Sequence, residues 1–260
     1  MDSTHTAVEY LAGLLCCEKG HENMERMTEK VKDSDHKRYI HFLSVSNWSA
    51  SEVNNATLKA TDNLLRAQKT KNGLPTGLVV DETSHLKKGS KSVAVSRQYA
   101  ALAGKVDNCQ VAVHTSLANG KFCTLVVTEL FIPEVWTNDK KKCNQAGIPT
   151  EEQEFETKPQ LALKLIKQAI AAGVEFDFIA GDGLYGHNAE LTRALDDLNL
   201  FYVLDVHKDE TVFLLEPTFS IPERKGNKGR IPTNVQPDIQ PIQFKTILKL
   251  LQIRIIQQKM

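Results

Sequence analysis

The chain has 260 residues, of which 41% are hydrophobic and 25% are charged, so it is long enough to bury one substantial core or two modest ones. Lys plus Arg and Asp plus Glu both total 32, and this zero net charge excludes neither a nucleic-acid partner nor an acidic substrate, because local patches attract polyanions. The five cysteines form no CxxC pair, which argues against a disulfide framework or a zinc ribbon and favours a reducing cytoplasm.

The first part of the chain, residues 1 to about 70, is expected to be a helical region. Apolar residues recur at helical spacing at Val8, Leu11 and Leu14. Ser49 with Glu52 three residues later is a capping-box pattern that begins a further helix. One face of that helix is predicted to carry Val53, Thr57, Ala60 and Leu64. A small helical bundle without chemistry is the simplest interpretation. This N-terminus lacks the basic start of a secretory signal, and no apolar run in the chain is long enough to span a bilayer.

The segment "KTKNGLP", residues 69–75, is charged and punctuated by Gly and Pro, and it predicts a domain boundary. Three strands follow, "GLVVDET" (77–83), "CQVAVHTSL" (109–117) and "KFCTLVVTELFIP" (121–133). The last two are separated by "ANG", in which Asn119 and Gly120 suit a hairpin turn. We therefore expect three sequential antiparallel strands.

The pattern then changes to that of alternating helices and strands. A helix is predicted from Thr157, with Pro159 in its first turn and Gly173 at its end. It is followed by a strand "VEFDFIA" (174–180), a helix "HNAELTRALDDLNL" (187–200) and a strand "LFYVLDV" (200–206). The order of three strands, helix, strand, helix and strand predicts an α/β fold with a mixed sheet.

Two carboxylates mark candidate chemistry. Asp81 and Asp182 each come directly after an apolar strand, and strand ends are where an α/β sheet can bring distant acids together. Such a pair commonly holds Mg²⁺ or Mn²⁺, which relieves the repulsion between the two charges. Oxygen ligands with positions left open for water and phosphate suit phosphodiester chemistry. The alternative is that both residues are strand-end acids that cap a loop.

A run of cationic side chains follows Asp81, with no acid between Glu82 and Asp107. Its members are Lys87, Lys88, Lys91, Arg97 and Lys105. This basic run could hold a nucleic-acid backbone near the two aspartates. The alternative is a solvated basic loop. There is no GxGxxG, Walker, HExxH or GxSxG motif, and the eight histidines are scattered.

Four ordered blocks carry a resemblance to a known family. They are "LVVDETSHLKKGSKSVAVSRQYAALAGKVDNCQVAVHTSL", "FIPEVWTNDKKKCNQAGIP", "FETKPQLALKLIKQAIAAGVEFDFIAGDGLYG" and "LFYVLDVHKD". Together they closely resemble the DDE-type transposases of prokaryotic insertion sequences, in the subgroup of DDE superfamily endonucleases. The resemblance extends from the N-terminal helices to about residue 240.

The resemblance implies an RNase H-like fold with an Asp, Asp, Glu triad that binds two divalent metal ions, Mg²⁺ or Mn²⁺. The first Asp corresponds to Asp81 in "VVDET" and the second to Asp182 in "AGDGLYG". It also implies nicking and joining of double-stranded DNA at insertion-sequence ends, a homodimer on that DNA, and a cytoplasmic, nucleoid-associated location. The implied division is a helical region at 1–70, a catalytic core at 76–210, and the start of an inserted segment at 211–260.

The third acid of the triad has no match in this chain. In the family it is a Glu on a helix beyond the inserted segment, whereas the last Glu here is Glu223 in a loop. No acid occurs from Ile239 onward, and "FKTILKLLQIRIIQQKM" is apolar and basic, which we interpret as the aberrant end of a truncated, catalytically impaired copy. Asp205 in "FYVLDV" is the nearest substitute, although a strand residue has less reach than one on a helix.

Three functions remain open from the sequence. The first is an impaired DDE transposase. The second is a DNA-binding remnant without catalysis that interferes with intact transposase, which the missing Glu favours. The third is a metal-dependent nuclease of repair or RNA processing, and cleavage specificity would separate it from the first.

Overall fold

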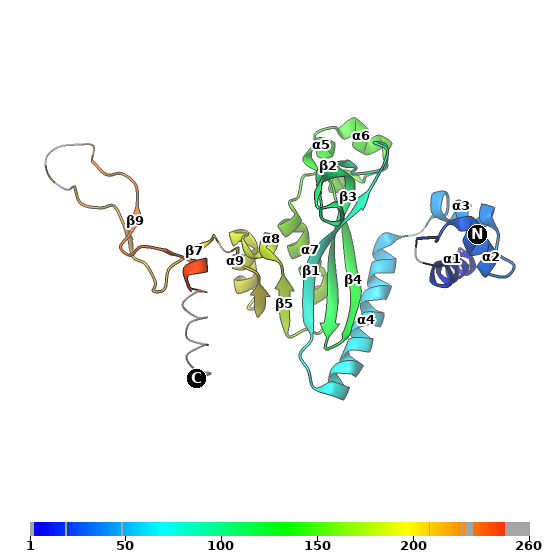
Figure 1. Cartoon of the computed structure of the whole chain (residues 1–260), viewed down its shortest axis with the longest axis horizontal. Coiled ribbons are helices and arrows are strands. Elements are labelled where there is room, and N and C mark those ends of the chain that lie inside the picture. The colour runs from blue at the N-terminus through cyan, green and yellow to red at the C-terminus, as the bar shows by residue number, and fades with distance from the viewer. Residues whose placement is uncertain are drawn as a thin grey trace. The chain divides into compact units, whose positions relative to one another are not determined.

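The computed structural model describes residues 3–18, 20–47, 49–207, 209–224, 226 and 231–247. The chain divides into two compact units, Met1–Val53 and Asn54–Met260 (Figure 1). The break at 69–75 lies inside the second unit, because the helix α4 (Ala50–Asn72) continues to Asn72. The division at 53/54 thus precedes the boundary that the sequence suggested.

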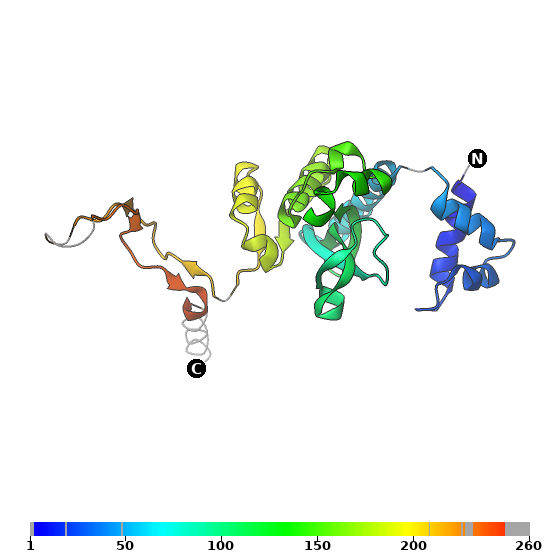
Figure 2. The same ribbon diagram turned by 90° about the horizontal axis from the view of Figure 1, so that it is seen from above.

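The first unit contains three helices, shown in blue in Figure 2: α1 (Thr4–Cys16), α2 (Met24–Lys30) and α3 (His36–Ser44). The helix around Val8 is confirmed, but its predicted apolar face is exposed, with Val8 at 63% and Leu11 at 57%. The buried face instead carries Glu9 and Gly13. A Cβ on Gly13 would lie 2.7 Å from the Cβ of Met27, so this glycine lets α2 approach closely.

Helix α4 begins as predicted, since the Glu52 backbone N–H donates to Ser49 Oγ at 3.2 Å. Its predicted apolar face is wrong, because Val53, Thr57, Ala60 and Leu64 are all exposed. The buried stripe runs through Leu58, Thr61 and Leu65. Leu58 and Leu65 join the main core, and Thr61 Oγ1 donates to the carbonyl oxygen of Leu125 at 3.4 Å. Both stripes have helical spacing, so contact with the sheet decides which one is buried.

The second unit is built on a mixed sheet of six strands. These are β1 (Gly77–Leu86), β2 (Ser96–Ala100), β3 (Lys105–Asn119), β4 (Phe122–Phe131), β5 (Phe178–Gly181) and β6 (Tyr202–Leu204). The order is β2-β3-β1-β5-β6, with β4 also paired to β3. β1, β3 and β4 are antiparallel neighbours, while β5 and β6 continue the sheet in parallel from β1. The predicted α/β fold with a mixed sheet is confirmed.

The basic run after β1 is not wholly a loop, because it contains β2. Cys109 of β3 pairs with Leu86 of β1 and also with Ser96 of β2, so β2 lies on the opposite side of β3 from β1. The strand escaped prediction because "SRQYA" is mostly polar and only Ala100 is buried, as is typical of an edge strand.

Short and long helices connect the strands. They are α5 (Glu134–Thr137), α6 (Lys140–Gln145), α7 (Lys158–Ala171), α8 (Gly183–Gly186) and α9 (Ala189–Asp197), with 3-10 turns at Ala101–Ala103 and Thr150–Glu152. α7 begins with a capping box between Thr157 and Gln160. It ends near Gly173, whose φ of 76° favours glycine. Both ends of this predicted helix are therefore confirmed.

One face of the sheet is packed and the other is more exposed. Alternation along β1 turns Leu78 and Val80 toward the main core, where they join Leu161 and Leu165 of α7. Val79 and Asp81 alternate with them on the other face, where Asp81 is exposed. The core thus holds β1 rigidly while its polar positions remain accessible.

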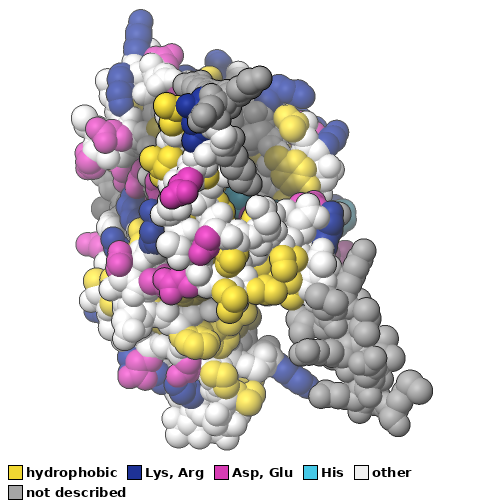
Figure 3. Space-filling view, turned by 90° about the vertical axis from the view of Figure 1, so that its left-hand side faces the viewer, with side chains coloured by type: hydrophobic (Ala, Val, Ile, Leu, Met, Phe, Trp, Pro, Cys, Tyr) yellow, Lys and Arg dark blue, Asp and Glu magenta, His cyan; other side chains and the backbone are white. Residues whose placement is uncertain are grey.

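In its described part, the segment after β6 contains two short strand pairs, β7 (Thr211–Val212) with β10 (Ile242–Gln243) and β8 (Phe219–Ser220) with β9 (Gln236–Pro237), and helical residues at 244–247. Exposed apolar side chains occur along it at Leu214, Leu215, Phe219, Ile221, Ile231 and Val235, and Figure 3 shows apolar side chains at the surface on this side. Residues 248–260, most of the apolar and basic end, lie outside the described residues. Among those described, no helix is long and apolar enough to cross a membrane.

Candidate functional site

The two candidate aspartates lie on neighbouring strand segments: Asp182 directly follows β5, whereas Asp81 lies within β1, which continues to Leu86 beyond the strand end that the sequence suggested. Val80 of β1 pairs with Gly181 of β5 in parallel register, and Asp81 and Asp182 are the next residues of each chain segment. Adjacent strands lie about 4.8 Å apart. β1 and β5 lie side by side in Figure 1. The parallel register therefore brings residues about 100 positions apart in the sequence to neighbouring positions at the carboxyl end of β5, as expected for a site in an α/β fold.

Each aspartate is oriented by a backbone N–H. Asp81 Oδ1 accepts from the N–H of Glu82 at 2.8 Å, and Asp182 Oδ1 accepts from the N–H of Leu184 at 2.9 Å, which makes Asp182 the N-cap of α8. Both side chains are exposed. Within the described residues, no hydrogen bond occupies the second oxygen of either carboxylate. The pair can offer oxygen ligands to a divalent cation.

The glycines of "GDGLYG" are required by close packing around Asp182. A Cβ on Gly186 would lie 2.0 Å from the carbonyl oxygen of Asp205, so any larger residue would push α8 away from the segment that follows β6. A Cβ on Gly181 would lie 3.3 Å from the ring of Tyr185. The turn that presents Asp182 is thus tightly packed against β6.

A second polar group lies behind the aspartates and was not predicted. Glu82 Oε1 pairs with Lys158 Nζ at 2.9 Å, and Glu82 Oε2 accepts from the Tyr185 hydroxyl at 2.9 Å. Burial of Tyr185 raises the pKa of its hydroxyl well above the usual range, and the charges of Glu82, Asp182 and Asp81 add to this effect. The hydroxyl therefore stays protonated and donates to Glu82.

His114 is the residue opposite Asp81 on β3. Its Nδ1 lies 2.8 Å from Thr128 Oγ1. Burial lowers the pKa of His114, the charge of His85 lowers it further, and Asp81 opposes both effects. Because directly paired residues share a face, Asp81, His114 and Thr128 form a polar row across three strands.

Asp205, the suggested substitute for the third acid, follows the neighbouring strand. Leu204 of β6 pairs with Gly181, and the Asp205 N–H donates to the carbonyl oxygen of Gly181 at 3.0 Å. Asp182 and Asp205 both line an open groove of about 720 Å³. Across the described ranges, however, no group of three or more His, Cys, Asp or Glu side chains is arranged to hold a metal ion. In this arrangement Asp205 does not complete a triad.

The basic run begins after the end of β1, farther from Asp81 than the sequence suggested. Lys87, Lys88 and Lys91 connect β1 to β2, and Arg97 is on β2. At about 3.3 Å per residue, the end of β1 is roughly 17 Å from Asp81. Lys105 at the start of β3 already pairs with Asp107 at 3.2 Å. The pKa of Asp107 is lowered by the Asn108 N–H, by Lys105 and by Arg97.

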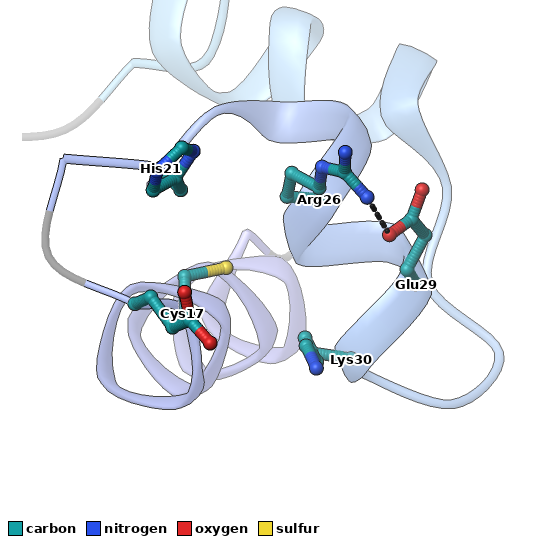
Figure 4. Close-up of a pocket in the computed structure, with 6 residues that line it drawn as sticks. Cys17, His21, Arg26, Glu29 and Lys30 are labelled. Atoms are coloured by element: carbon teal, nitrogen blue, oxygen red, sulfur yellow. Dashed lines mark hydrogen bonds and ion pairs between the residues drawn. The ribbon is translucent and has the colours of Figure 1, made fainter.

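The N-terminal unit contains a separate small cavity of about 290 Å³. Its lining includes Cys17, His21 and Lys30, together with Arg26 and Glu29, which form an ion pair at 3.0 Å (Figure 4). All of its lining residues belong to the first unit.

Comparison with known proteins identifies relatives along most of the chain. A family model described as DDE superfamily endonuclease matches residues 1–251. The probable transposase for insertion sequence element IS701 of Microchaete diplosiphon is 34% identical over 176 residues, covering 67% of this chain and 42% of that protein. The chain thus spans less than half the length of this curated relative.

Two solved structures show weaker similarity. The Mos1 strand transfer complex aligns with 76% of this chain and 57% of its own, at 14% identity and a TM-score of 0.27. The Mos1 mariner paired end complex with Mn aligns with 69% of this chain and 53% of its own, at 12% identity and a TM-score of 0.22.

Proposed function

Because the chain belongs to the DDE superfamily endonucleases, we propose that it acts in DNA transposition by metal-dependent cleavage and transfer of DNA strands, with Asp81 and Asp182 as its metal ligands. The observation that supports this proposal is the parallel register of β1 and β5, in which Val80 pairs with Gly181, the residues that directly precede the two aspartates.

The donor set fits a divalent cation. Asp81 on β1 and Asp182 at the start of α8 would supply two exposed carboxylates, and Mg²⁺ is commonly held by one or two carboxylates with water in its remaining positions. When bound, Mg²⁺ or Mn²⁺ would activate a water or a 3′-hydroxyl for attack on a DNA phosphorus. The protein residues orient this chemistry, since backbone N–H groups fix both carboxylates.

Lys87, Lys88, Lys91, Arg97 and Lys105 form the proposed DNA-binding surface. They would hold double-stranded DNA through its phosphates, without reading the bases. A distance of roughly 17 Å from Asp81 to the end of β1 is about half a turn of DNA, so one duplex could contact both regions. Joining two insertion-sequence ends would require a second copy of the chain, and we include a homodimer on DNA in the proposal.

Catalysis by these 260 residues is expected to be impaired. A second ion over the leaving oxygen requires a further carboxylate, and none joins Asp81 and Asp182 in the part of the chain that the structure describes. This observation favours a second candidate function, a DNA-binding protein without catalysis that interferes with intact transposase by occupying its DNA ends.

Purified protein incubated with Mg²⁺ or Mn²⁺ and a duplex that carries insertion-sequence ends would test both candidates. Weak nicking that disappears in Asp81→Asn and Asp182→Asn, but persists in the exposed control Asp197→Asn, supports the first. DNA binding without any nicking supports the second. Efficient double-strand cleavage that is lost in both Asp81→Ala and Asp205→Ala would show that Asp205 completes the site. Cleavage of any duplex regardless of its ends would favour a general nuclease.

A further inference from the structure

Glu82 and Tyr185 connect the two segments that carry the aspartates. Glu82 follows Asp81 on β1, and Tyr185 lies three residues after Asp182 on α8. The Tyr185 hydroxyl donates to Glu82 Oε2 at 2.9 Å, across 103 residues of sequence. This hydrogen bond spans the same two segments whose separation sets the distance between Asp81 and Asp182.

Glu82 is already engaged and faces away from the candidate ligands. Alternation along β1 places it on the opposite face from Asp81, and its two oxygens accept from Lys158 and Tyr185. Its side chain is 18% exposed, and that of Lys158 is 20% exposed. A carboxylate so buried and so paired is suited to holding other groups in place rather than to binding a solvated ion.

Tyr185 transmits its position to Asp182 through α8. The ring is fully buried, and the Tyr185 N–H donates to the carbonyl oxygen of Asp182 at 3.1 Å. The N–H of the preceding residue, Leu184, donates to Asp182 Oδ1. A shift of the Tyr185 ring would therefore move the cap that orients the Asp182 carboxylate.

We propose that Glu82 and Tyr185 are positioning residues whose hydrogen bond sets the spacing of Asp81 and Asp182 and thereby the affinity of the site for a divalent cation. This inference rests on the proposed function, because it takes the two aspartates as metal ligands. Lys158 holds Glu82 from α7 and does not reach α8 through this contact, so its contribution is to Glu82 alone.

The test is Mn²⁺ binding to the full chain without DNA, measured by electron paramagnetic resonance of the free ion. Tyr185→Phe removes only the hydroxyl and should weaken Mn²⁺ binding about 10-fold, as is usual when a residue that orients a metal ligand is lost. Glu82→Asp keeps the charge but shortens the reach, so it should weaken binding similarly and add little to Tyr185→Phe. It also serves as the second variant if Tyr185→Phe does not fold.

Tyr202→Phe is the matched control, because the Tyr202 hydroxyl also donates to a carboxylate, Asp196, at 3.1 Å, but at the other end of β6. Unchanged Mn²⁺ affinity in folded Tyr185→Phe or Glu82→Asp, or an equal loss in Tyr202→Phe, would overturn the inference. Lys158→Met separates the effect of charge from the effect of position. Loss of this nearby positive charge by itself would tighten Mn²⁺ binding, whereas loss of the Tyr185 hydroxyl in Tyr185→Phe should weaken it.

Asp81→Asn separates this inference from the proposed function. If wild-type protein binds Mn²⁺ and Asp81→Asn abolishes that binding, the metal site stands whatever Tyr185→Phe shows. If Asp81→Asn leaves Mn²⁺ binding unchanged, the metal-site assignment fails and the positioning role fails with it.

Discussion

At the scale of single residues, the proposed roles of Asp81 and Asp182 are chemical, and we expect both side chains to contribute little to stability. Both carboxylates are exposed and lie outside the packed core. Asp81→Asn and Asp182→Asn should therefore abolish metal-dependent nicking while the free energy of unfolding changes by no more than about 1 kcal/mol, the cost of a weakened cap. Urea unfolding followed by circular dichroism, beside the nicking assay, checks both statements. A large loss of stability in either variant would mean that the residue is structural.

Asp177 is predicted to make stability depend on pH. Its carboxylate accepts from Lys69 Nζ at 2.6 Å and from the Thr76 N–H at 2.7 Å, and both contacts lower its pKa in the folded protein. A lowered folded-state pKa means that the stabilisation is fully present above about pH 4 and is lost as the pH falls through the folded value. Asp177→Asn should therefore cost no more than about 1 kcal/mol at pH 7 and progressively less in acid. Urea midpoints of both proteins from pH 7 to pH 3 would show the difference narrowing; a constant difference would contradict the assignment.

At the scale of elements, the buried stripe of α4 is the strongest stability prediction. Leu58 and Leu65 are 1% and 4% exposed, and Leu64 is 68% exposed. Leu58→Ala and Leu65→Ala should each lower the free energy of unfolding by about 2–5 kcal/mol, because each leaves a cavity in the core. The matched substitution Leu64→Ala should change it by less than about 0.5 kcal/mol. Equal losses in all three variants would indicate that Leu64 is buried as well, as the sequence suggested.

The elements also show how far the sequence could predict the structure. Strands β1, β3 and β4 and helix α7 were predictable, since their apolar spacing and caps agree with their burial. The buried face of α4 was not predictable, because its two candidate stripes have the same helical spacing and differ only in what packs on them. Strand β2 was missed because a polar edge strand has no apolar alternation.

The candidate site was also predictable only in part. Asp81 and Asp182 could be proposed from the sequence because each follows an apolar run, whereas the hydrogen bonds around them could not. Glu82 contacts Lys158 and Tyr185, which are 76 and 103 residues away in the sequence, respectively. No local sequence pattern predicts such contacts. Which residues strand pairing makes neighbours can be predicted only once the sheet topology is known.

At the scale of the whole molecule, DNA binding should depend on salt through the basic run. Alanine at Lys87, Lys88, Lys91, Arg97 and Lys105 together should weaken binding to all sequences alike and flatten the plot of log affinity against log salt by roughly 0.9 unit for each phosphate that is no longer neutralised. Because Lys105 already pairs with Asp107, Lys105→Ala alone should change the slope less than Lys88→Ala. Fluorescence anisotropy from 50 to 300 mM salt measures these slopes, with the exposed α7 residue variant Lys167→Ala as control. An unchanged slope in the five-residue variant would leave the basic run as a solvated surface.

The parallel pairing of β1 with β5 has a consequence for folding kinetics. β1 can pair with β3 as soon as the chain reaches Asn119, but its other edge stays open until β5 has been synthesised and has closed a loop of roughly 100 residues. During that interval the nascent protein carries Asp81 without Asp182 and exposes an unpaired strand edge that another chain can join. The step that covers this edge of β1 is therefore the same step that assembles the pair of carboxylates.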